Sequence, residues 1–442
     1  MSGCVEEFPS IVVTEILSYL TWNEKLNATQ AVPSWKPHLR TPAAWPLVCY
    51  CSEGEENVYF VKEKRANLLI CFKIYGKYMR HIDLAFGYKT GRSGLQILNA
   101  IANYCPNVQS FHFVPQENPG AESPAETRLT RSDVVAVCSI LSNCKQLSNV
   151  GIISPIILWS NSPGTNLILE LCSANVANKV TELELISGSL LDHDGYLKLL
   201  REFTGLKKLM VRREKINNEI LLTLVKNGLQ EITLYQDEEL ALVDAQQLGE
   251  KLWNDILKIN PKFRVDLILQ YILVIKDSFI TNMPLRSLVL DDLVNIVTKG
   301  VIDHLVTYYN ETLESFTYTN LYLENFESGD SRLPAALVTM VKKCQHLHTL
   351  RYGFPLSSTS ILLLAKARKL RELTIPAVEV SYEMDWEVQE DWDIDFWQWL
   401  EANCKSEPLL ENAVSELLGF RWQLFYENFN YLTFERNLGL NL

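Results

Sequence analysis

The sequence has no apolar run that approaches the roughly 18 to 20 residues needed to span a membrane as a helix. It begins Met1-Ser-Gly-Cys-Val-Glu6-Glu7, without the basic and then apolar stretches of a secretory signal. We therefore expect no membrane partner and a location in the cytoplasm, the nucleus or both.

An excess of basic residues is also missing, because 41 Lys and Arg stand against 53 Asp and Glu and give a net charge of −12. A general nucleic-acid binder would carry a basic footprint, so no nucleic-acid partner is expected. The sequence contains no glycine-rich phosphate loop, HExxH or GxSxG motif, and its carboxylates show no pairing suited to acid–base catalysis. These absences predict a protein that is not an enzyme, with no catalytic residues and no cofactor.

The ten cysteines include no CxxC pair. Cys49 and Cys51 are one residue apart, which suits neither a mutual disulfide nor common zinc sites. The cysteines are therefore interpreted as buried thiols in a reducing compartment. Cys344-Gln-His346-Leu-His348 comes nearest to a metal cluster; both histidines are expected on one face of a strand, but no second half of a site is visible, so no metal is predicted.

What the sequence does contain is a recurring motif with apolar residues at its first, fourth and sixth positions, here called the repeat motif. Alternation within it is typical of a short strand, and spacings of three and four between copies are typical of helices. Start-to-start spacings range from 22 residues (263 to 285) to 39 (108 to 147). Clear copies begin at Leu206, Leu229, Leu285, Leu347 and Leu370, looser ones at Met79, Val108, Leu147, Val180 and Leu313, and a degenerate one at Phe263.

One strand and one helix per unit predict an α/β fold in which stacked copies bury a continuous core. The series resembles leucine-rich repeats of the ribonuclease-inhibitor-like type over residues 78–380. The resemblance implies a curved solenoid with strands along its inner face and helices along its outer face. Ser357-Ser-Thr-Ser360 is interpreted as a helix N-cap region within it.

Residues 8–45 have a different pattern, with an amphipathic stripe of Val13, Ile16, Leu17 and Leu20 and a second short helix expected near Asn23. They resemble an F-box, whose pattern is Leu-Pro, then Glu-Ile-Leu-Ser-Tyr-Leu, a second helix, a Trp and a closing Pro-x-x-Trp. The matching residues are Phe8-Pro9, Glu15–Leu20, Trp35 and Pro42-x-x-Trp45.

The F-box resemblance implies docking onto a Skp-type adaptor and, through it, a cullin–RING ubiquitin ligase. Lys25 and Gln30 occupy positions that are usually apolar in that family, and Pro33 and Pro37 are expected to bend the segment around Trp35. The alternative is a plain helical cap for the repeats. The residues implied at or beneath the adaptor interface are Pro9, Ile16, Leu17, Leu20, Leu26, Val32 and Trp35.

The resulting domains are an F-box (1–50), a linker and N-terminal cap (51–77), the repeats (78–380) and an acidic loop with a C-terminal cap (381–442). Residues that alternate with the buried ones are expected to face outward along the strands. A protein substrate of unknown identity is expected to bind there. Lys208 and Arg212 belong to a basic cluster that is either a site for an acidic segment or a solvated strand end balanced by Glu182 and Glu184. The predicted substrate-binding residues are Lys208, Arg212, Tyr235, Arg351, Glu182 and Glu184; the outward set also includes His112, Met210, Glu231, Asp291 and Glu372.

After Val378 the composition becomes acidic and rich in tryptophan. A helix with Phe396, Trp399 and Leu400 on one face is expected, then a second over 409–422 and strand-like alternation over 425–434. This segment is either a cap over the last repeat or a surface that recruits a basic segment.

These features together predict a substrate-recognition subunit of an SCF-type (Skp–cullin–F-box) E3 ubiquitin ligase. The alternative is a leucine-rich-repeat scaffold or inhibitor that acts without a ligase.

Overall fold

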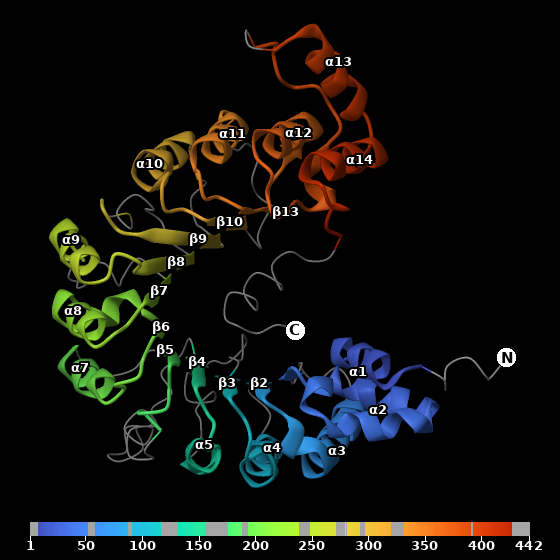
Figure 1. Ribbon diagram of the computed structural model, residues 1–442, viewed down its shortest axis with the longest axis vertical. Helices are drawn as coiled ribbons and strands as arrows, with labels where there is room; N and C mark the ends of the chain where they lie inside the picture. The colour runs from blue at the N-terminus through green and yellow to red at the C-terminus, as the bar shows by residue number, and fades with distance from the viewer. Residues whose placement is uncertain are drawn as a thin grey trace. The chain divides into compact units, whose positions relative to one another are not determined.

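The computed structural model of the 442-residue chain is an α/β structure with a large parallel sheet of twelve strands in the part of the chain that it describes (Figure 1). The chain divides into two compact units, one formed mainly by residues 1–215 and the other mainly by residues 230–438. The described residues are 8–51, 58–86, 91–115, 131–154, 176–187, 193–237, 248–270, 279, 281–291, 297–319, 331–389 and 392–426.

The N-terminal helices form where the sequence predicts them. Pro9 precedes helix α1 (Ser10–Tyr19), and its missing N–H costs nothing at that position. Thr21 and Glu24 form a capping box at the start of helix α2 (Trp22–Ala31). Pro33 and Pro37 lie in a 3₁₀ segment, η1 (Pro33–Arg40), which continues the chain as a tighter helix. A second 3₁₀ turn, η2 (Pro42–Ala44), leads to Trp45.

Trp45 closes this helical module. Its indole Nε1 donates to the carbonyl oxygen of Leu39 at 2.7 Å, and its ring stacks on Tyr75 with centroids 5.4 Å apart. The ammonium of Lys25 lies 5.4 Å from the centroid of the same ring and donates to the carbonyl oxygen of Leu20. Lys25, unusual at an apolar position, is therefore fully buried and paired; burial lowers its pKa to about 8.

In the first unit, strands follow the chain order β1 to β6, and each described pair is parallel. Its strands are β1 (Val48–Cys51), β2 (His81–Phe86), β3 (Ser110–Pro115), β4 (Asn149–Ser154), β5 (Glu182–Ser187) and β6 (Lys208–Arg212). Its helices are α3 (Val58–Tyr75), α4 (Gly91–Tyr104), α5 (Arg131–Asn143) and α7 (His193–Arg201), with short 3₁₀ turns η3 (Gly76–Tyr78) and η5 (Arg213–Lys215). Helix α8 (Asn218–Lys226) has residues in both units.

The second unit has the same construction. Its parallel strands are β7 (Glu231–Asp237), β8 (Arg264–Gln270), β9 (Leu285–Asp291), β10 (Ser315–Thr319), β11 (Thr349–Tyr352) and β13 (Glu372–Thr374), with a separate pair, β12 (Leu356–Ser357) and β14 (Val380–Ser381). Its helices are α9 (Glu250–Ile259), α10 (Lys299–Tyr309), α11 (Leu333–Lys343), α12 (Ser358–Ala367), α13 (Ile394–Asn403) and α14 (Glu407–Leu418), with the 3₁₀ turn η9 (Ala377–Glu379). In each unit, most of the described strands are thus followed by a helix, as the periodicity predicts.

Every predicted repeat motif overlaps a strand, and its three apolar residues are buried. Leu285, Leu288 and Leu290 of β9, for example, have no exposed surface. Alternation within a strand sends the fourth and sixth residues to one face, where they pack beneath the helices. The α/β prediction is confirmed.

One copy escaped the sequence prediction. Trp45, Val48 and Tyr50 follow the same spacing and are buried, and β1 pairs in parallel with β2 through Val48 and Ile82. The motif was missed because two of its three positions are aromatic, and because this segment was assigned to the F-box resemblance. The predicted domain boundary at residue 50 therefore falls inside a strand.

The C-terminal helices agree in part with expectation. Helix α13 includes Phe396, Trp399 and Leu400, while α14 ends at Leu418, four residues before the predicted end, because Gly419 adopts φ +79 and stops it. Phe425 makes a parallel bridge to Pro376, but most of the strand expected over 425–434 lies outside the described residues. Residues 116–130, which fall within the longest spacing between repeat motifs (108 to 147), also lie outside the described residues.

Among the described residues, no helix combines the length and the hydropathy that crossing a membrane requires.

Candidate functional site on the polar faces of the strands

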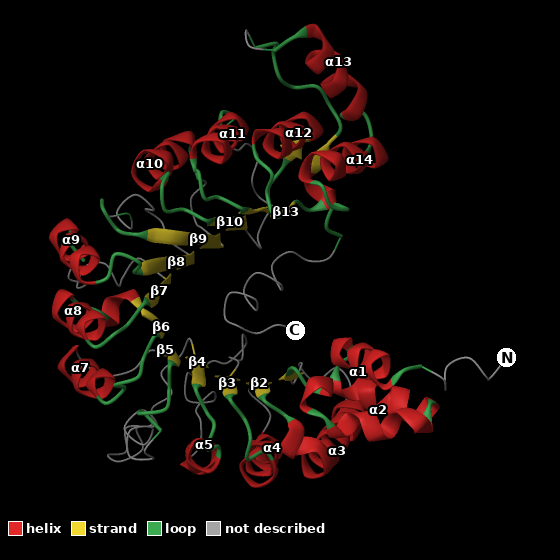
Figure 2. Ribbon diagram, viewed as in Figure 1, coloured by secondary structure: helices red, strands yellow, loops and turns green. Residues whose placement is uncertain are grey.

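In each unit, helices lie along one face of the strands (Figure 2). The third, fifth and seventh residues of each repeat motif lie on the opposite face. In the first unit the fifth residues of successive motifs stand in register. Asp83 of β2 is opposite His112 of β3, His112 is opposite Gly151 of β4, and Gly151 is opposite Glu184 of β5. One polar row therefore crosses four strands.

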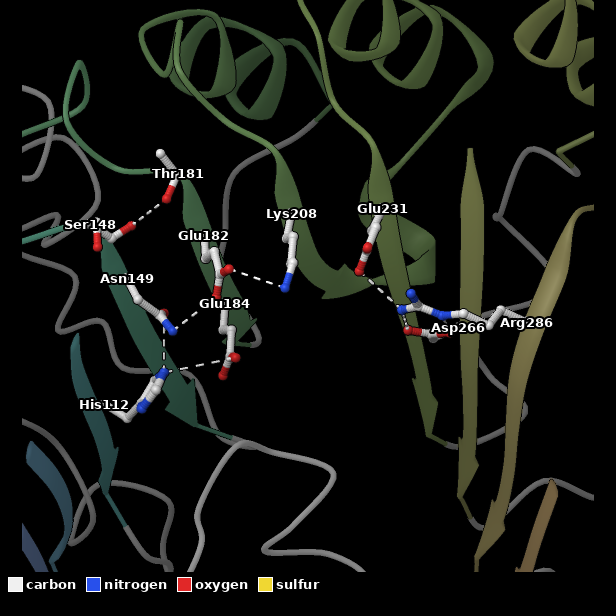
Figure 3. A network of polar contacts seen from close by, with 10 residues as sticks. All are labelled: His112, Ser148, Asn149, Thr181, Glu182, Glu184, Lys208, Glu231, Asp266 and Arg286. Atoms are coloured by element: carbon white, nitrogen blue, oxygen red, sulfur yellow. Dashed lines mark hydrogen bonds and ion pairs between the residues drawn. The ribbon is translucent and has the colours of Figure 1, made fainter. Parts of the chain in front are cut away.

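His112 lies between the two acidic residues of this row, and Figure 3 shows its contacts with Asn149 and Glu184. Its Nδ1 lies 2.7 Å from Oδ1 of Asp83, its Nε2 lies 3.2 Å from Oδ1 of Asn149, and Oε1 of Glu184 is 3.8 Å from Nε2. Both nitrogens face acceptors, an arrangement that fits the protonated imidazolium. Burial alone lowers the pKa of His112, but the bond to Asp83 and the charges of Glu184 and Asp83 outweigh it and raise that pKa to about 9.

Glu184 has the opposite balance. Burial raises the pKa of its carboxyl to about 7, against the attraction of His112, and the nearby charges of Asp83 and Glu182 add to the rise. Within the described residues, Oδ2 of Asp83 and Oε2 of Glu184 accept no hydrogen bond. The row thus holds one cation between two carboxylates that retain accepting capacity.

Gly151 makes room for the imidazole. A Cβ at this position would lie 2.2 Å from Cδ2 of His112 and 3.2 Å from Oε2 of Glu184. The missing side chain is therefore what allows the ring to lie over β4 between its two acidic neighbours.

A neighbouring row is formed by third residues of the motifs. Nδ2 of Asn149 donates to Oε2 of Glu182 at 3.2 Å, and Nζ of Lys208 lies 3.1 Å from Oε1 of Glu182 (Figure 3). The Lys208 side chain is half exposed. The network therefore runs from the buried Asp83 to a cation at the surface.

The second unit carries a separate cluster around Arg286. Its Nε donates to Oδ1 of Asp266 at 2.9 Å, and one terminal nitrogen donates to Oε2 of Glu231 at 3.0 Å. Burial raises the pKa of Asp266 even though the guanidinium opposes it. The β8–β9 pairing shifts between Val265 and Asp266, so that Leu285 and Ser287 pair with consecutive residues and Arg286 is the extra residue of a bulge. That bulge puts an arginine where it can reach both acids.

Further polar pairs lie in the second unit. The hydroxyl of Tyr235 donates to Oε1 of Gln270 at 2.7 Å, and the hydroxyl of Thr319 donates to Oδ1 of Asp291 at 2.6 Å. Arg351 binds both oxygens of Glu372, from Nε at 2.7 Å and from a terminal nitrogen at 2.9 Å. This bidentate geometry is the strong form of an arginine–carboxylate pair.

The predicted substrate-binding residues lie on the polar strand faces of both units and differ in exposure: Glu182, Glu184, Lys208 and Arg212 are in the first unit, and Tyr235 and Arg351 are in the second. Glu182, Glu184, Arg351 and Lys208 are partly or well exposed, and Arg212 is held by Glu214 at 2.6 Å. Tyr235 is buried, so its predicted role as an exposed aromatic anchor is wrong. The same correction applies to His112, Met210 and Asp291, which are buried rather than outward-facing.

Sequence reasoning missed Asp83, Asn149, Asp266 and Arg286. The first two occupy the fifth and third positions of looser motifs, so reading those positions systematically would have found them. The bulge that turns Arg286 toward Asp266 has no comparable signal in the sequence.

The residues predicted for adaptor docking lie in the N-terminal module. Leu17 and Trp35 are buried, Ile16, Leu20, Leu26 and Val32 are half-buried, and Pro9 is exposed. The largest exposed apolar side chains of α1 are two others, Ile11 at 78% and Tyr19 at 79%. This helix therefore presents an apolar surface that the described chain does not cover.

The histidines near Cys344 do not lie as expected. His346 is in a turn and His348 precedes β11, which begins at Thr349. They do not share the face of a strand. Nε2 of His348 lies 3.8 Å from Oε2 of Glu314.

No family model and no curated protein matches the chain. The chemistry of the site must therefore be judged from its own residues. Its carboxylates and cations form pairs across neighbouring strands, and such an arrangement is suited to binding a polar surface of a partner.

Proposed function

We propose that the protein is a substrate-recognition subunit of an SCF-type E3 ubiquitin ligase. The observation that supports this proposal most is the exposed apolar surface of α1. This helix belongs to a module that also has the F-box spacing of Pro9, Trp35 and Trp45. Large exposed apolar side chains such as Ile11 and Tyr19 are available for a protein–protein contact. In this proposal the module holds a Skp-type adaptor, which links the chain to a cullin–RING ligase.

The repeats hold the protein substrate in the same proposal, as a leucine-rich-repeat solenoid with the polar strand faces turned to the partner. The parallel strands and the regular burial of the repeat motif support this interpretation. The polar faces are acidic as well: Asp83, Glu182 and Glu184 outnumber His112 and Lys208 in the first unit.

The chain's contribution would be proximity. Holding a substrate and an adaptor on one polypeptide raises the local concentration of substrate near the conjugating enzyme. No residue of this chain needs to take part in ubiquitin transfer.

The adaptor test requires substitutions at half-buried rather than buried positions. Ile16→Asp and Leu20→Asp put a charge into the docking surface, whereas Leu17→Asp would put one into the core and could unfold the module. Val388, an apolar residue of the second unit that is 60% exposed, supplies the matched control Val388→Asp.

Immobilised full-length protein is expected to retain purified Skp-type adaptor, and either α1 variant is expected to lose at least about tenfold in affinity, since burying an unpaired charge costs well over ~1.4 kcal/mol. The control variant should bind as the parent does. Circular dichroism of each variant verifies folding. Retention by folded Ile16→Asp and Leu20→Asp, or no retention by the parent, would refute the docking role.

The second candidate is a leucine-rich-repeat scaffold or inhibitor without a ligase. It is favoured by the paired charges on the strand faces, which could bind a partner without an adaptor. A parent protein that binds a cellular partner but not the adaptor would establish this alternative.

A further inference from the structure

The segment that follows β14 is attached to the N-terminal end of α12 by its backbone and one indole. The hydroxyl of Thr359 donates to the carbonyl oxygen of Glu383 at 2.8 Å, and Nε1 of Trp386 donates to Oγ of Ser360 at 2.8 Å. The hydroxyls of α12 are buried. These contacts hold the segment against the second unit and leave much of its outer side open.

A run of aromatic rings continues from Trp386 into α13. The ring centroids of Trp386 and Trp392 are 6.2 Å apart, those of Trp392 and Trp397 are 6.1 Å apart, and those of Trp392 and Phe396 are 5.4 Å apart with the two rings nearly perpendicular. These four rings are partly exposed. Indole and phenyl faces left partly open to water are unusual unless something covers them.

The charges around these rings have one sign. The sequence has no Lys, Arg or His from Glu372 to Asn403. Among the described residues of this stretch, Glu383, Asp385, Glu387 and Asp395 are exposed and none of the described ion pairs includes them. Asp393 is also exposed, and its carboxylate caps α13 through the N–H of Phe396 at 2.7 Å.

The rings already accept one cation from within the chain. Nζ of Lys366, from α12, lies 5.8 Å from the centroid of Phe396. An ammonium over an aromatic face is stabilised by the ring quadrupole. This contact shows the kind of group that the neighbouring open rings can take.

We propose that Trp386, Trp392, Phe396 and Trp397, with Glu383, Asp385, Glu387 and Asp395, form an acidic–aromatic surface that docks a segment rich in Lys and Arg from a partner protein. Ring faces hold the cationic groups and apolar stems, and the carboxylates pair with the charges. Nucleic acids and anionic membranes carry the wrong sign for this surface. The inference does not depend on the ligase role, because it concerns the second unit alone.

The test measures fluorescence anisotropy of a labelled peptide of alternating Lys, Arg, Gly and Ser residues with the full-length protein. The same peptide with Gln in place of Lys and Arg is the ligand control. We expect saturable binding of the basic peptide that weakens as salt rises from about 50 to about 300 mM, since exposed charges are screened, and no binding of the Gln peptide.

The charge variant Asp385→Asn/Glu387→Gln/Asp395→Asn keeps the shape of the surface. It should bind the basic peptide at least about tenfold more weakly, because three complementary charges are lost together. The control variant Glu202→Gln/Glu311→Gln/Glu416→Gln removes the same charge from exposed sites elsewhere and should bind as the parent does. Equal weakening in both variants would mean general attraction to an acidic protein and would overturn the proposal.

The aromatic part is tested by Trp397→Leu, which keeps an apolar residue but removes one ring. A loss of about three- to fivefold is expected, the value of one exposed cation–π contact. Unchanged binding in this variant and in Trp386→Leu would remove the rings from the site. Light scattering tests a different occupant: a dimer of the parent that the charge variant dissociates would assign the surface to self-association and refute the proposal.

Discussion

At the scale of the residue, His112 is held between acids that favour its charged form. Its folded pKa of about 9 lies above the ordinary value of 6.5, so the folded chain binds this proton more tightly than the unfolded chain does. The stabilisation is complete below about pH 6.5 and is lost as pH rises through about 9. Glu184, with a pKa raised to about 7, acts in the same direction at lower pH.

The free energy of unfolding should therefore decrease between about pH 6.5 and 9, by up to about 3 kcal/mol from His112. His112→Gln removes this dependence, so the difference in stability between parent and variant should be largest near pH 6.5 and smallest near pH 9. Urea denaturation across this range measures both. A constant difference would mean that folding does not raise the pKa of His112.

Gly151 supplies a second prediction at this scale. Gly151→Ala should lower the free energy of unfolding by about 2–3 kcal/mol, because the new methyl displaces the His112 ring from Asp83. In a His112→Ala background the same change should cost much less. Denaturation of the four proteins of this cycle gives the coupling, and equal costs in both backgrounds would contradict the packing described for β4.

The polar partners were predictable only to a degree. The alternation of the strands places Glu182, Glu184 and Lys208 on the face opposite the repeat motif, and they do pair there. The burial of His112 was not predictable, because the sequence around it does not indicate that a glycine, Gly151, lies beside it on the next strand. Tyr235 was misjudged for the same reason: its partner, Gln270, is 35 residues away.

At the scale of the element, α12 begins with buried hydroxyl residues that each have a definite task. Ser357 accepts a hydrogen bond from the N–H of Ser360 and caps the helix, as the sequence predicts. Ser358 donates to the carbonyl oxygen of Cys404 at 2.6 Å, at the end of α13. The cap region thus also ties α12 to the C-terminal helices.

Ser358→Ala should lower the free energy of unfolding by about 1–2 kcal/mol, because it leaves the buried carbonyl of Cys404 without this donor. Ser34→Ala, at an exposed position in η1, should change stability by less than about 0.5 kcal/mol. Thermal and urea denaturation compare the two. Similar small effects would show that the Ser358 bond contributes nothing net.

The repeat motif predicted strands because three apolar residues at fixed spacing fit one face of a short strand. It located the strands of the large sheet from β2 onward even where Phe, Val or Met replaced Leu. It failed at β1, where Trp45 also belongs to the helical module, and at the bulge in β9. The spacing of apolar residues does not indicate that Trp45 belongs both to the helical module and to a repeat motif, or that a strand contains a bulge.

At the scale of the whole molecule, the described cysteines differ in how deeply they are buried. Burial raises the pKa of Cys71 to about 12 and the pKa values of Cys144 and Cys344 to about 11. Since the thiolate is the reactive form, burial and low acidity act together to protect these residues. The buried cysteines of both units should therefore react slowly with thiol reagents.

Iodoacetamide labelling of the native protein at about pH 8, followed by peptide mass spectrometry, should modify Cys49 and Cys138, which are partly exposed, at least about tenfold faster than Cys71, Cys144 and Cys344. In denaturant the rates should converge. Rapid native labelling of the three buried thiols would show that the cores open far more easily than their packing implies.

The pairing of β1 with β2 has a practical consequence for anyone shortening this chain. Removing residues 1–50 would take away nearly all of β1 and leave the backbone N–H and C=O groups of β2 that face β1 open to water along a bare sheet edge. Such an edge is a template for another chain, so the truncated protein is expected to aggregate for reasons unrelated to any lost adaptor. Point substitutions on α1 keep that edge covered, and a comparison based on them separates recognition from solubility.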